Sequence, residues 1–184
     1  AEPQRTNLIT YSEDFSNAVW IDSEATTTLN QTNSPDGNNN GAKLKESTST
    51  STHSIIIGSG TVSNTETLSV FAKKGDRNWI ALQGGTSYGY FDLENGVLGG
   101  TSAASSKMVS YSNDWYKCSI TFTRAANTNN FIYLAEGDFG ASYTGNGTSF
   151  VYIWGASLEV GSYPTSYIPT SGSTVTRNQD IFTR

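Results

Sequence analysis

Apolar residues recur at every second position in most segments of this chain, and Gly, Asn, Ser or Pro interrupts the pattern after about 6 to 12 residues. A helix would need apolar residues at spacings of three and four, and such spacing is hard to find anywhere in the sequence. Short alternating runs are typical of β-strands that bury one face. The pattern therefore predicts an all-β fold, a two-sheet antiparallel β-sandwich of the jelly-roll kind, concanavalin A-like or galactose-binding-like.

Strands are expected wherever the alternation runs between two turn signals. The expected strands are Asn7–Tyr11, Ala25–Gln31, Ala42–Glu46, His53–Ile57, Thr67–Lys73, Trp79–Gln83, Tyr88–Leu93, Met108–Tyr111, Trp115–Arg124, Phe131–Glu136 and Phe150–Val160. The small, polar residues 99–106 favour a surface loop between sheets. Residues 1–184 are expected to form one domain, with 162–184 as a tail that lies extended over the sandwich, because Pro164 and Pro169 cannot donate to a ladder.

Charge and composition narrow the range of partners. The 184 residues carry a net charge of −5, and no run of Lys or Arg is longer than Lys73-Lys74, so neither nucleic acid nor an anionic membrane surface is an expected partner. The 4 Trp, 10 Tyr and 8 Phe indicate a folded chain. The single Cys118 and the single His53 leave no internal disulfide, no structural zinc set and no Cys/His catalytic pair.

Side chains alternate across a strand, so each expected strand has a core face and an outer face. We assign the more aliphatic side to the core, for example Leu68, Val70 and Ala72. By the same rule, the outer face of Trp115–Arg124 is expected to be ordinary solvated sheet, and Trp154 to lie in the core or on the floor of a groove. One broad, open sheet is then expected to display Phe71, Trp79, Tyr88, Tyr90 and Tyr133, interleaved with Lys73, Gln83 and Asp92.

Flat rings beside hydrogen-bonding groups are what a sugar-binding surface requires. A pyranose packs its C–H groups on an aromatic face, and its hydroxyls need amide and carboxylate partners. The expected ligand is therefore a polysaccharide or a cell-surface glycan, with Trp79 as the strongest single candidate. Two other interpretations stay open: the tail or a second subunit of a homo-oligomer could bury these rings, or the rings could serve only cross-strand packing.

Catalytic residues do not occur in a suitable pattern. Glycoside hydrolysis needs two carboxylates about 5 Å or roughly 6.5–9.5 Å apart, and Glu136 and Asp138 are interpreted as a solvated pair in a turn. A lyase would need a His and a Tyr over a basic groove, and His53 is interpreted as a surface or strand-start residue. We therefore do not expect an enzyme. A polysaccharide hydrolase or lyase is the alternative, and products in a glycan panel would reveal it.

No cofactor is required by this interpretation, and no metal ligands are identified. Residues 36–41 resemble a calcium loop only superficially, because they lack the alternating acidic oxygens and the terminal Glu of an EF-hand. Structural Ca²⁺ could bridge strand ends through Glu13, Asp14 or Glu159, although no spacing favours it.

Three segments together resemble a known family. They are Thr6-Asn-Leu-Ile-Thr-Tyr-Ser-Glu-Asp-Phe-Ser-Asn-Ala-Val-Trp20, Tyr90-Phe-Asp-Leu-Glu-Asn-Gly96 and Tyr152-Ile-Trp-Gly-Ala-Ser-Leu-Glu-Val-Gly-Ser-Tyr-Pro-Thr-Ser-Tyr-Ile-Pro-Thr170. Over nearly its whole length the chain resembles a module of bacteriophage structural proteins, labelled a head spike fibre or tail-fibre domain. That module is similar to the jelly-roll carbohydrate-binding modules of bacterial polysaccharide-degrading enzymes.

The resemblance implies a non-catalytic β-sandwich that attaches a larger multidomain protein or a virion to a glycan, on a virion surface or outside the cell. Trp20, Trp154, Pro164 and Tyr167 look like packing anchors of the family. The runner-up interpretation is a structural virion-fibre module that oligomerises through the same aromatic residues and has no glycan site of its own. The acidic surface favours neutral glycans over anionic ones, unless Lys73, Lys74 and Arg77 gather locally.

Overall fold

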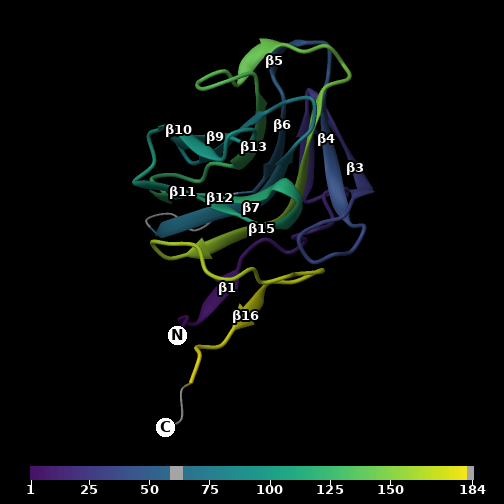
Figure 1. Cartoon of the computed structure of the whole chain (residues 1–184). Coiled ribbons are helices and arrows are strands. Elements are labelled where there is room, and N and C mark those ends of the chain that lie inside the picture. The colour runs from purple at the N-terminus through teal and green to yellow at the C-terminus, as the bar shows by residue number, and fades with distance from the viewer. Residues whose placement is uncertain (59–63, 182–184) are drawn as a thin grey trace.

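The computed structural model describes residues 1–58 and 64–181. Two antiparallel sheets of six strands each lie face to face, as the two layers of ribbon in Figure 1 show. The first sheet contains, in spatial order, β10 (Val97–Thr101), β9 (Ser87–Asp92), β8 (Trp79–Gly84), β13 (Asn130–Ala135), β6 (Ser54–Ile57) and β2 (Trp20–Ser23). The second contains β11 (Ser105–Ser110), β12 (Trp115–Thr123), β7 (Thr65–Lys74), β15 (Phe150–Val160), β4 (Gly41–Glu46) and β3 (Ala25–Thr32).

Two short ribbons complete the β-structure. β5 (Thr50–Thr52) pairs with β14 (Ser142–Thr144), and β1 (Arg5–Asn7) pairs with β16 (Val175–Arg177). A single 3₁₀ turn, η1 (Ser112–Asp114), precedes β12. In Figure 1 the β1–β16 ribbon lies beside the second sheet, and the N-terminus is on that side. Among the described residues, no helix is long and apolar enough to cross a membrane.

The core lies between the sheets and is built by the alternation seen in the sequence. Leu68 and Val70 of β7, Ile80 and Leu82 of β8, and Ile120 of β12 are each 1% exposed or less. Complete burial of such a side chain contributes about 1.5–3 kcal/mol relative to exposure, so these alternating runs fix which face of each strand turns inward. The predicted all-β two-sheet sandwich is confirmed.

The expected strands agree closely with the observed ones, apart from Asn7–Tyr11, where β1 ends at Asn7. Five short strands lie outside the expected set, namely β2, β5, β10, β14 and β16. The loop expected over residues 99–106 does join the two sheets, but it is shorter, because β10 continues to Thr101 and β11 begins at Ser105.

The outer face of the second sheet differs from the expectation. Trp115 is 0% exposed and Lys117 6% exposed, so the outer face of β12 is not solvated sheet. The C-terminal tail covers it: Lys117 Nζ donates to the Thr165 carbonyl, and Thr121 Oγ1 donates to the Ser162 carbonyl at 3.4 Å. Strand alternation alone does not show that a later segment will form a further layer.

Candidate functional site

The first sheet brings together six of the eight predicted ligand-binding residues on its outer face. Neighbouring strands contribute them in register: Tyr88 of β9 lies opposite Gln83 of β8, and Tyr90 lies opposite Ala81. Ala81 is also opposite Tyr133 of β13 on its other side. A methyl group between two tyrosine rings leaves a depression, with one ring rising on each side.

This depression is an open groove with a volume of about 270 Å³. Four of the predicted residues line it, namely Gln83, Tyr88, Tyr90 and Tyr133, together with Ala81 at the base. The remaining lining comes from segments outside the three strands, namely Thr52, Phe139, Ala141 and Ser142. The groove is thus bounded by the sheet below and by the β5–β14 ribbon and its preceding loop at the side.

The rings of the groove are held in mutual contact. Tyr88 and Tyr90 meet edge to face with centroids 5.8 Å apart, and Phe139 lies 5.4 Å from Tyr90. On the other side, Tyr133 stacks on Phe131 with ring planes 6° apart. Each ring therefore already packs against a neighbouring ring before a ligand arrives, which lowers the conformational entropy lost on binding.

Phe139 is the one aromatic residue among the five groove-lining residues that were not predicted; the other four are Thr52, Ala81, Ala141 and Ser142. The Phe139 side chain is 61% exposed, and its backbone φ of 58° lies in the left-handed region that a residue in a tight turn can adopt. Asp138 fixes this turn, because its Oδ1 accepts the backbone N–H of Gly100 at 2.7 Å. An aromatic residue inside the turn Glu136-Gly-Asp-Phe-Gly140, directly after a strand that carries site residues, is the signal that could have identified it.

The polar groups of the groove retain hydrogen-bonding capacity. Tyr133 Oη donates to Gln83 Oε1 at 3.1 Å, and Gln83 Nε2 donates to the Gly85 carbonyl at 3.0 Å. Burial raises the pKa of Tyr133 to about 12, and burial also raises the pKa of Tyr90. Both phenols therefore stay protonated at neutral pH. The Tyr133 oxygen can still accept a hydrogen bond, and Gln83 Nε2 has a second N–H to donate.

Two further predicted residues lie on the same sheet but outside the groove. Trp79 is half-buried and does not line it, because its ring packs over Gly99 of β10. Asp92 is only 6% exposed, and its carboxylate accepts the backbone N–H groups of Glu94 and Asn95, which fixes the turn into β10. The expectation that Asp92 lies on an open face is therefore wrong, because an Asp at the start of a turn accepts the backbone N–H groups that follow it.

Phe71 and Lys73 lie on β7 in the second sheet, so the eight residues do not share one sheet. Phe71 is 2% exposed and packs against Trp154 and Tyr167, with centroid distances of 5.2 Å and 5.9 Å. Its expected exposure is wrong, because the C-terminal tail carries Tyr167 over it. Lys73 is half-buried on the outer face of the second sheet.

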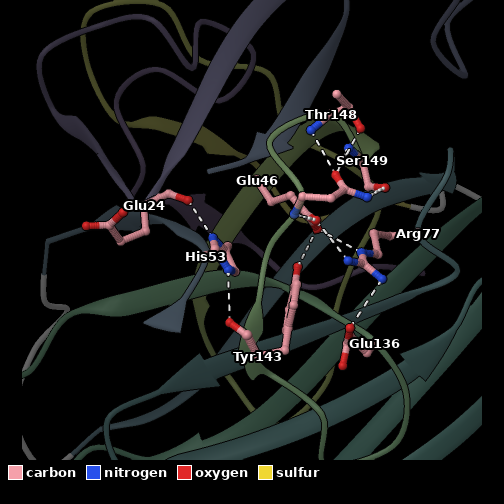
Figure 2. A network of polar contacts seen from close by, with 9 residues as sticks. Glu24, Glu46, His53, Arg77, Glu136, Tyr143, Thr148 and Ser149 are labelled. Carbon is pink, nitrogen blue, oxygen red and sulfur yellow. Dashed lines mark hydrogen bonds and ion pairs between the residues drawn. The ribbon is translucent and has the colours of Figure 1, made fainter. Parts of the chain in front are cut away.

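A buried polar network holds the wall of the groove, as Figure 2 shows. Arg77 donates to both oxygens of Glu46, at 2.7 Å and 2.8 Å. The Tyr143 hydroxyl of β14 and the backbone N–H of Asn146 donate to the same carboxylate, at 2.7 Å and 2.8 Å. Burial raises the pKa of Glu46, but the hydrogen bonds from Arg77, Asn146 and Tyr143 outweigh it, so the net shift is downward.

His53 belongs to the same region and lies directly before β6, as expected of a strand-start residue, but it is 0% exposed and so is not a surface residue. Its two ring nitrogens face backbone carbonyls, Nδ1 that of Glu24 at 2.6 Å and Nε2 that of Tyr143 at 3.4 Å. In Figure 2 the ring lies between these two segments. The imidazole therefore joins β14 to the chain before β3, and it does not line the groove.

The acidic residues considered for calcium have other partners. Glu13 accepts the Tyr167 hydroxyl at 2.9 Å, and Glu159 accepts the side-chain and backbone groups of Thr165. The Asp36 carboxylate accepts Ser34 and Asn38 within its own turn. In the described part of the chain, no three His, Cys, Asp or Glu residues are grouped as metal ligands. Bound calcium stays a prediction of the sequence alone.

Fold and site together define a class: a jelly-roll β-sandwich with an aromatic groove on the outer face of one sheet. No protein-family model matches the chain, and no curated protein matches it. A similar solved structure is that of the N-terminal CBM22-1 and GH10 modules of the Clostridium thermocellum endo-1,4-beta-D-xylanase 10B, complexed with xylohexaose. The similarity has a TM-score of 0.50 at 14% identity, and covers 92% of this chain and 30% of that one.

At this identity the likeness shows the fold alone, which is that of a carbohydrate-binding module. The chain spans less than a third of the length of the xylanase chain that it matches. The resemblance to phage fibre modules stays a prediction.

Proposed function

We propose that this protein is a non-catalytic carbohydrate-binding module and that the groove on β8, β9 and β13 binds a neutral glycan. The observation that carries the proposal is the set of mutually packed rings, Tyr88, Tyr90 and Phe139, in a groove that also holds the Gln83 amide and the Tyr133 phenol. In such a module the glycan-bound domain would attach a larger protein, or a virion, to its target.

The chemistry of the groove fits a sugar on two counts. The exposed face of Phe139 and the edges of Tyr88 and Tyr90 can pack against the C–H patch of a pyranose or pentose ring. Gln83, Tyr133 and Ser142 offer donors and acceptors to the hydroxyls at the ring edge. Because the groove-lining residues carry no charged side chain, they favour a neutral glycan over an anionic one.

The lining residues also support a binding role over a catalytic one. They include no carboxylate and no imidazole, whereas glycoside hydrolysis needs a pair of carboxylates. The acidic residues in the turn that carries Phe139 have other partners: Asp138 accepts from the backbone N–H of Gly100, and Glu136 pairs with Arg77 at 3.6 Å. Incubation with the glycans that bind should therefore release neither reducing ends nor unsaturated products.

Affinity gel electrophoresis on a panel of neutral polysaccharides, with xylan and its oligomers first, tests the proposal. Retention by at least one glycan is expected, and Tyr88→Ala and Phe139→Ala should each weaken it roughly 5- to 30-fold, from the loss of one ring contact and its burial. Tyr163→Ala is the matched control, since Tyr163 is 49% exposed and lies outside the groove. Unchanged retention of both groove variants, or no retention by any glycan, would contradict the assignment.

A second candidate function is self-association through the edge of the sandwich. The edge strands β10 and β11 expose Val97 (50%), Leu98 (48%) and Val109 (38%). An exposed apolar edge strand is a template for pairing with another chain. Light scattering would show a stable oligomer, and Leu98→Lys would dissociate it. If that oligomer also buried Phe139 and abolished glycan retention, the structural-module alternative would replace the glycan site.

A further inference from the structure

The outer face of the second sheet has an open end that the C-terminal tail does not cover. There, Lys43 and Lys45 of β4, Phe150 and Tyr152 of β15 and Lys73 of β7 are all partly exposed. We call these five residues the lysine patch. All five side chains project from the same face, because their neighbours in sequence, Ala42, Leu44, Ala72 and Val151, are buried in the core.

Strand register places the three lysines around the two rings. Tyr152 lies directly between Lys43 on β4 and Lys73 on β7, and Phe150 lies opposite Lys45. Adjacent strands are about 4.8 Å apart, so the Lys43 and Lys73 backbones are roughly 10 Å from each other across Tyr152. The Lys43 ammonium lies 4.0 Å from the centroid of Phe150, and Phe150 meets Tyr152 edge to face at 5.1 Å.

The lysines of the patch differ from the other cations nearby in having no carboxylate partner. Lys74 pairs with Glu94 at 2.5 Å, and Arg77 pairs with Glu46 and Glu136. Neither can therefore join Lys73 as a free cation, so the condition considered from the sequence, that Lys73, Lys74 and Arg77 gather as a cationic group, is not met. Among the described residues, Lys43, Lys45 and Lys73 form no ion pair within 4.0 Å. Three unpaired ammonium groups thus gather on one face of a chain whose net charge is −5.

We propose that the lysine patch is a second binding site, which takes the carboxylate-bearing sugars of an acidic polysaccharide. The ring of a uronic acid would pack on Tyr152, and its carboxylate would accept charge-assisted hydrogen bonds from Lys43 or Lys73. The long lysine side chains let both ammonium groups converge on one carboxylate or hold two successive ones. The site goes beyond the proposed function, because it lies on the opposite sheet and selects charge, which the groove does not.

Local charge and shape favour an acidic glycan over the other polyanions. Nucleic acid presents a continuous row of phosphates, and a protein that binds it needs an extended basic surface, whereas this patch has three lysines, no arginine and an acidic remainder. The same limits apply to an anionic membrane, which attracts clusters of about 4–8 basic residues. A single sugar acid matches the size of one partly exposed ring, Tyr152, flanked by two cations.

Isothermal titration calorimetry on the full chain tests the site. The ligands are low-ester polygalacturonate and the same polymer in fully methyl-esterified form. The acid form is expected to bind and the ester form to bind at least roughly tenfold more weakly, because the ester removes the charge that lysine recognises. The double variant Lys43→Gln/Lys73→Gln should weaken binding of the acid roughly 5- to 30-fold and flatten its dependence on salt. Lys107→Gln/Lys74→Gln removes the same charge elsewhere and should leave the affinity nearly unchanged.

The outcomes separate this site from the groove. Tyr88→Ala and Phe139→Ala should keep full affinity for polygalacturonate even if neutral glycans never bind. The assignment is overturned if the acid form does not bind, or if the double variant binds it as well as the parent does. It is also overturned if dextran sulfate or single-stranded DNA binds as tightly and with the same loss in the double variant, because the patch would then be a general polyanion site.

Discussion

At the scale of single residues, the position of Phe139 depends on the absence of a side chain at Gly100. A Cβ built on Gly100 would lie 1.9 Å from Phe139 Cζ, far inside van der Waals contact. Phe139 is mostly exposed, so its ring can move away at little cost in stability. Whether the ring packs over Gly100 therefore affects the shape of the groove more than it affects folding.

Gly100→Ala is expected to displace the Phe139 ring and to weaken neutral-glycan retention roughly 3- to 10-fold, while the free energy of unfolding changes by less than about 1 kcal/mol. Affinity electrophoresis and urea denaturation measure the two effects. Gly137→Ala in the same loop is the control, because a Cβ there meets nothing within 4 Å. Equal retention by the Gly100 and Gly137 variants would show that the ring does not bind.

At the scale of elements, the β5–β14 ribbon is joined to the sandwich through Tyr143, whose hydroxyl donates to the Glu46 carboxylate of the Arg77–Glu46 ion pair. The ribbon pairs only residues 50–52 with residues 142–144, whereas the Glu46 carboxylate, whose side chain is 0% exposed, receives Arg77, Tyr143 and the backbone of Asn146. Removing one partner of such a pair leaves the other buried and unpaired. Figure 2 shows that Glu46 is the centre of these contacts.

Glu46→Gln is expected to lower the free energy of unfolding by about 2–4 kcal/mol, a loss limited by the partial exposure of Arg77. Urea denaturation at neutral pH measures this change. Glu136→Gln is the control, because Glu136 is half-exposed and lies 3.6 Å from Arg77, so its loss should cost less than about 1 kcal/mol. Equal stability of the two variants would contradict the anchoring role.

Acidification should weaken the same Arg77–Glu46 ion pair and so lower the stability of the fold. The pKa of Glu46 is lowered in the folded protein, so its contribution is fully present above the ordinary glutamate pKa, about 4.3, and is lost as the pH falls through the folded value. Denaturation at neutral pH and at pH values below 4 should show a loss of stability on acidification that is smaller in Glu46→Gln than in the parent. An identical loss would place the acid sensitivity in other carboxylates.

The sequence predicts which face of a strand turns toward the core, but it does not predict what packs against the other face. Alternation correctly turned Tyr88, Tyr90 and Tyr133 outward, because aliphatic burial decides the inner face of a strand. Alternation does not say which sheet a strand joins, so it grouped Phe71 with rings on the opposite sheet. In β15 a bulge after Trp154, with Gly155 at φ 60°, reverses which side chains of the strand face the core in the residues that follow. Gly155 is the only sequence signal for this bulge.

At the scale of the whole molecule, the two ends of the chain hold each other in place over the second sheet. Asn7 is 0% exposed, and its Nδ2 donates to the carbonyls of Ala156 and Ile168 at 3.1 Å and 2.9 Å. Its Oδ1 accepts the backbone N–H groups of Ile9 and Leu158. One amide therefore links the N-terminal segment, β15 and the tail that covers Phe71 and Trp154.

Asn7→Ala would leave these backbone groups without their partner, and we expect it to lower the free energy of unfolding by about 2–4 kcal/mol. As the tail loosens, Trp115 and Trp154, now 0% and 4% exposed, should become more accessible to acrylamide in fluorescence quenching. Asn178→Ala, at an exposed position in the same tail, should change neither measurement. The groove lies on the other sheet, so folded Asn7→Ala protein should retain neutral glycans at the parent affinity. Loss of that affinity with the fold intact would show that the two faces are coupled.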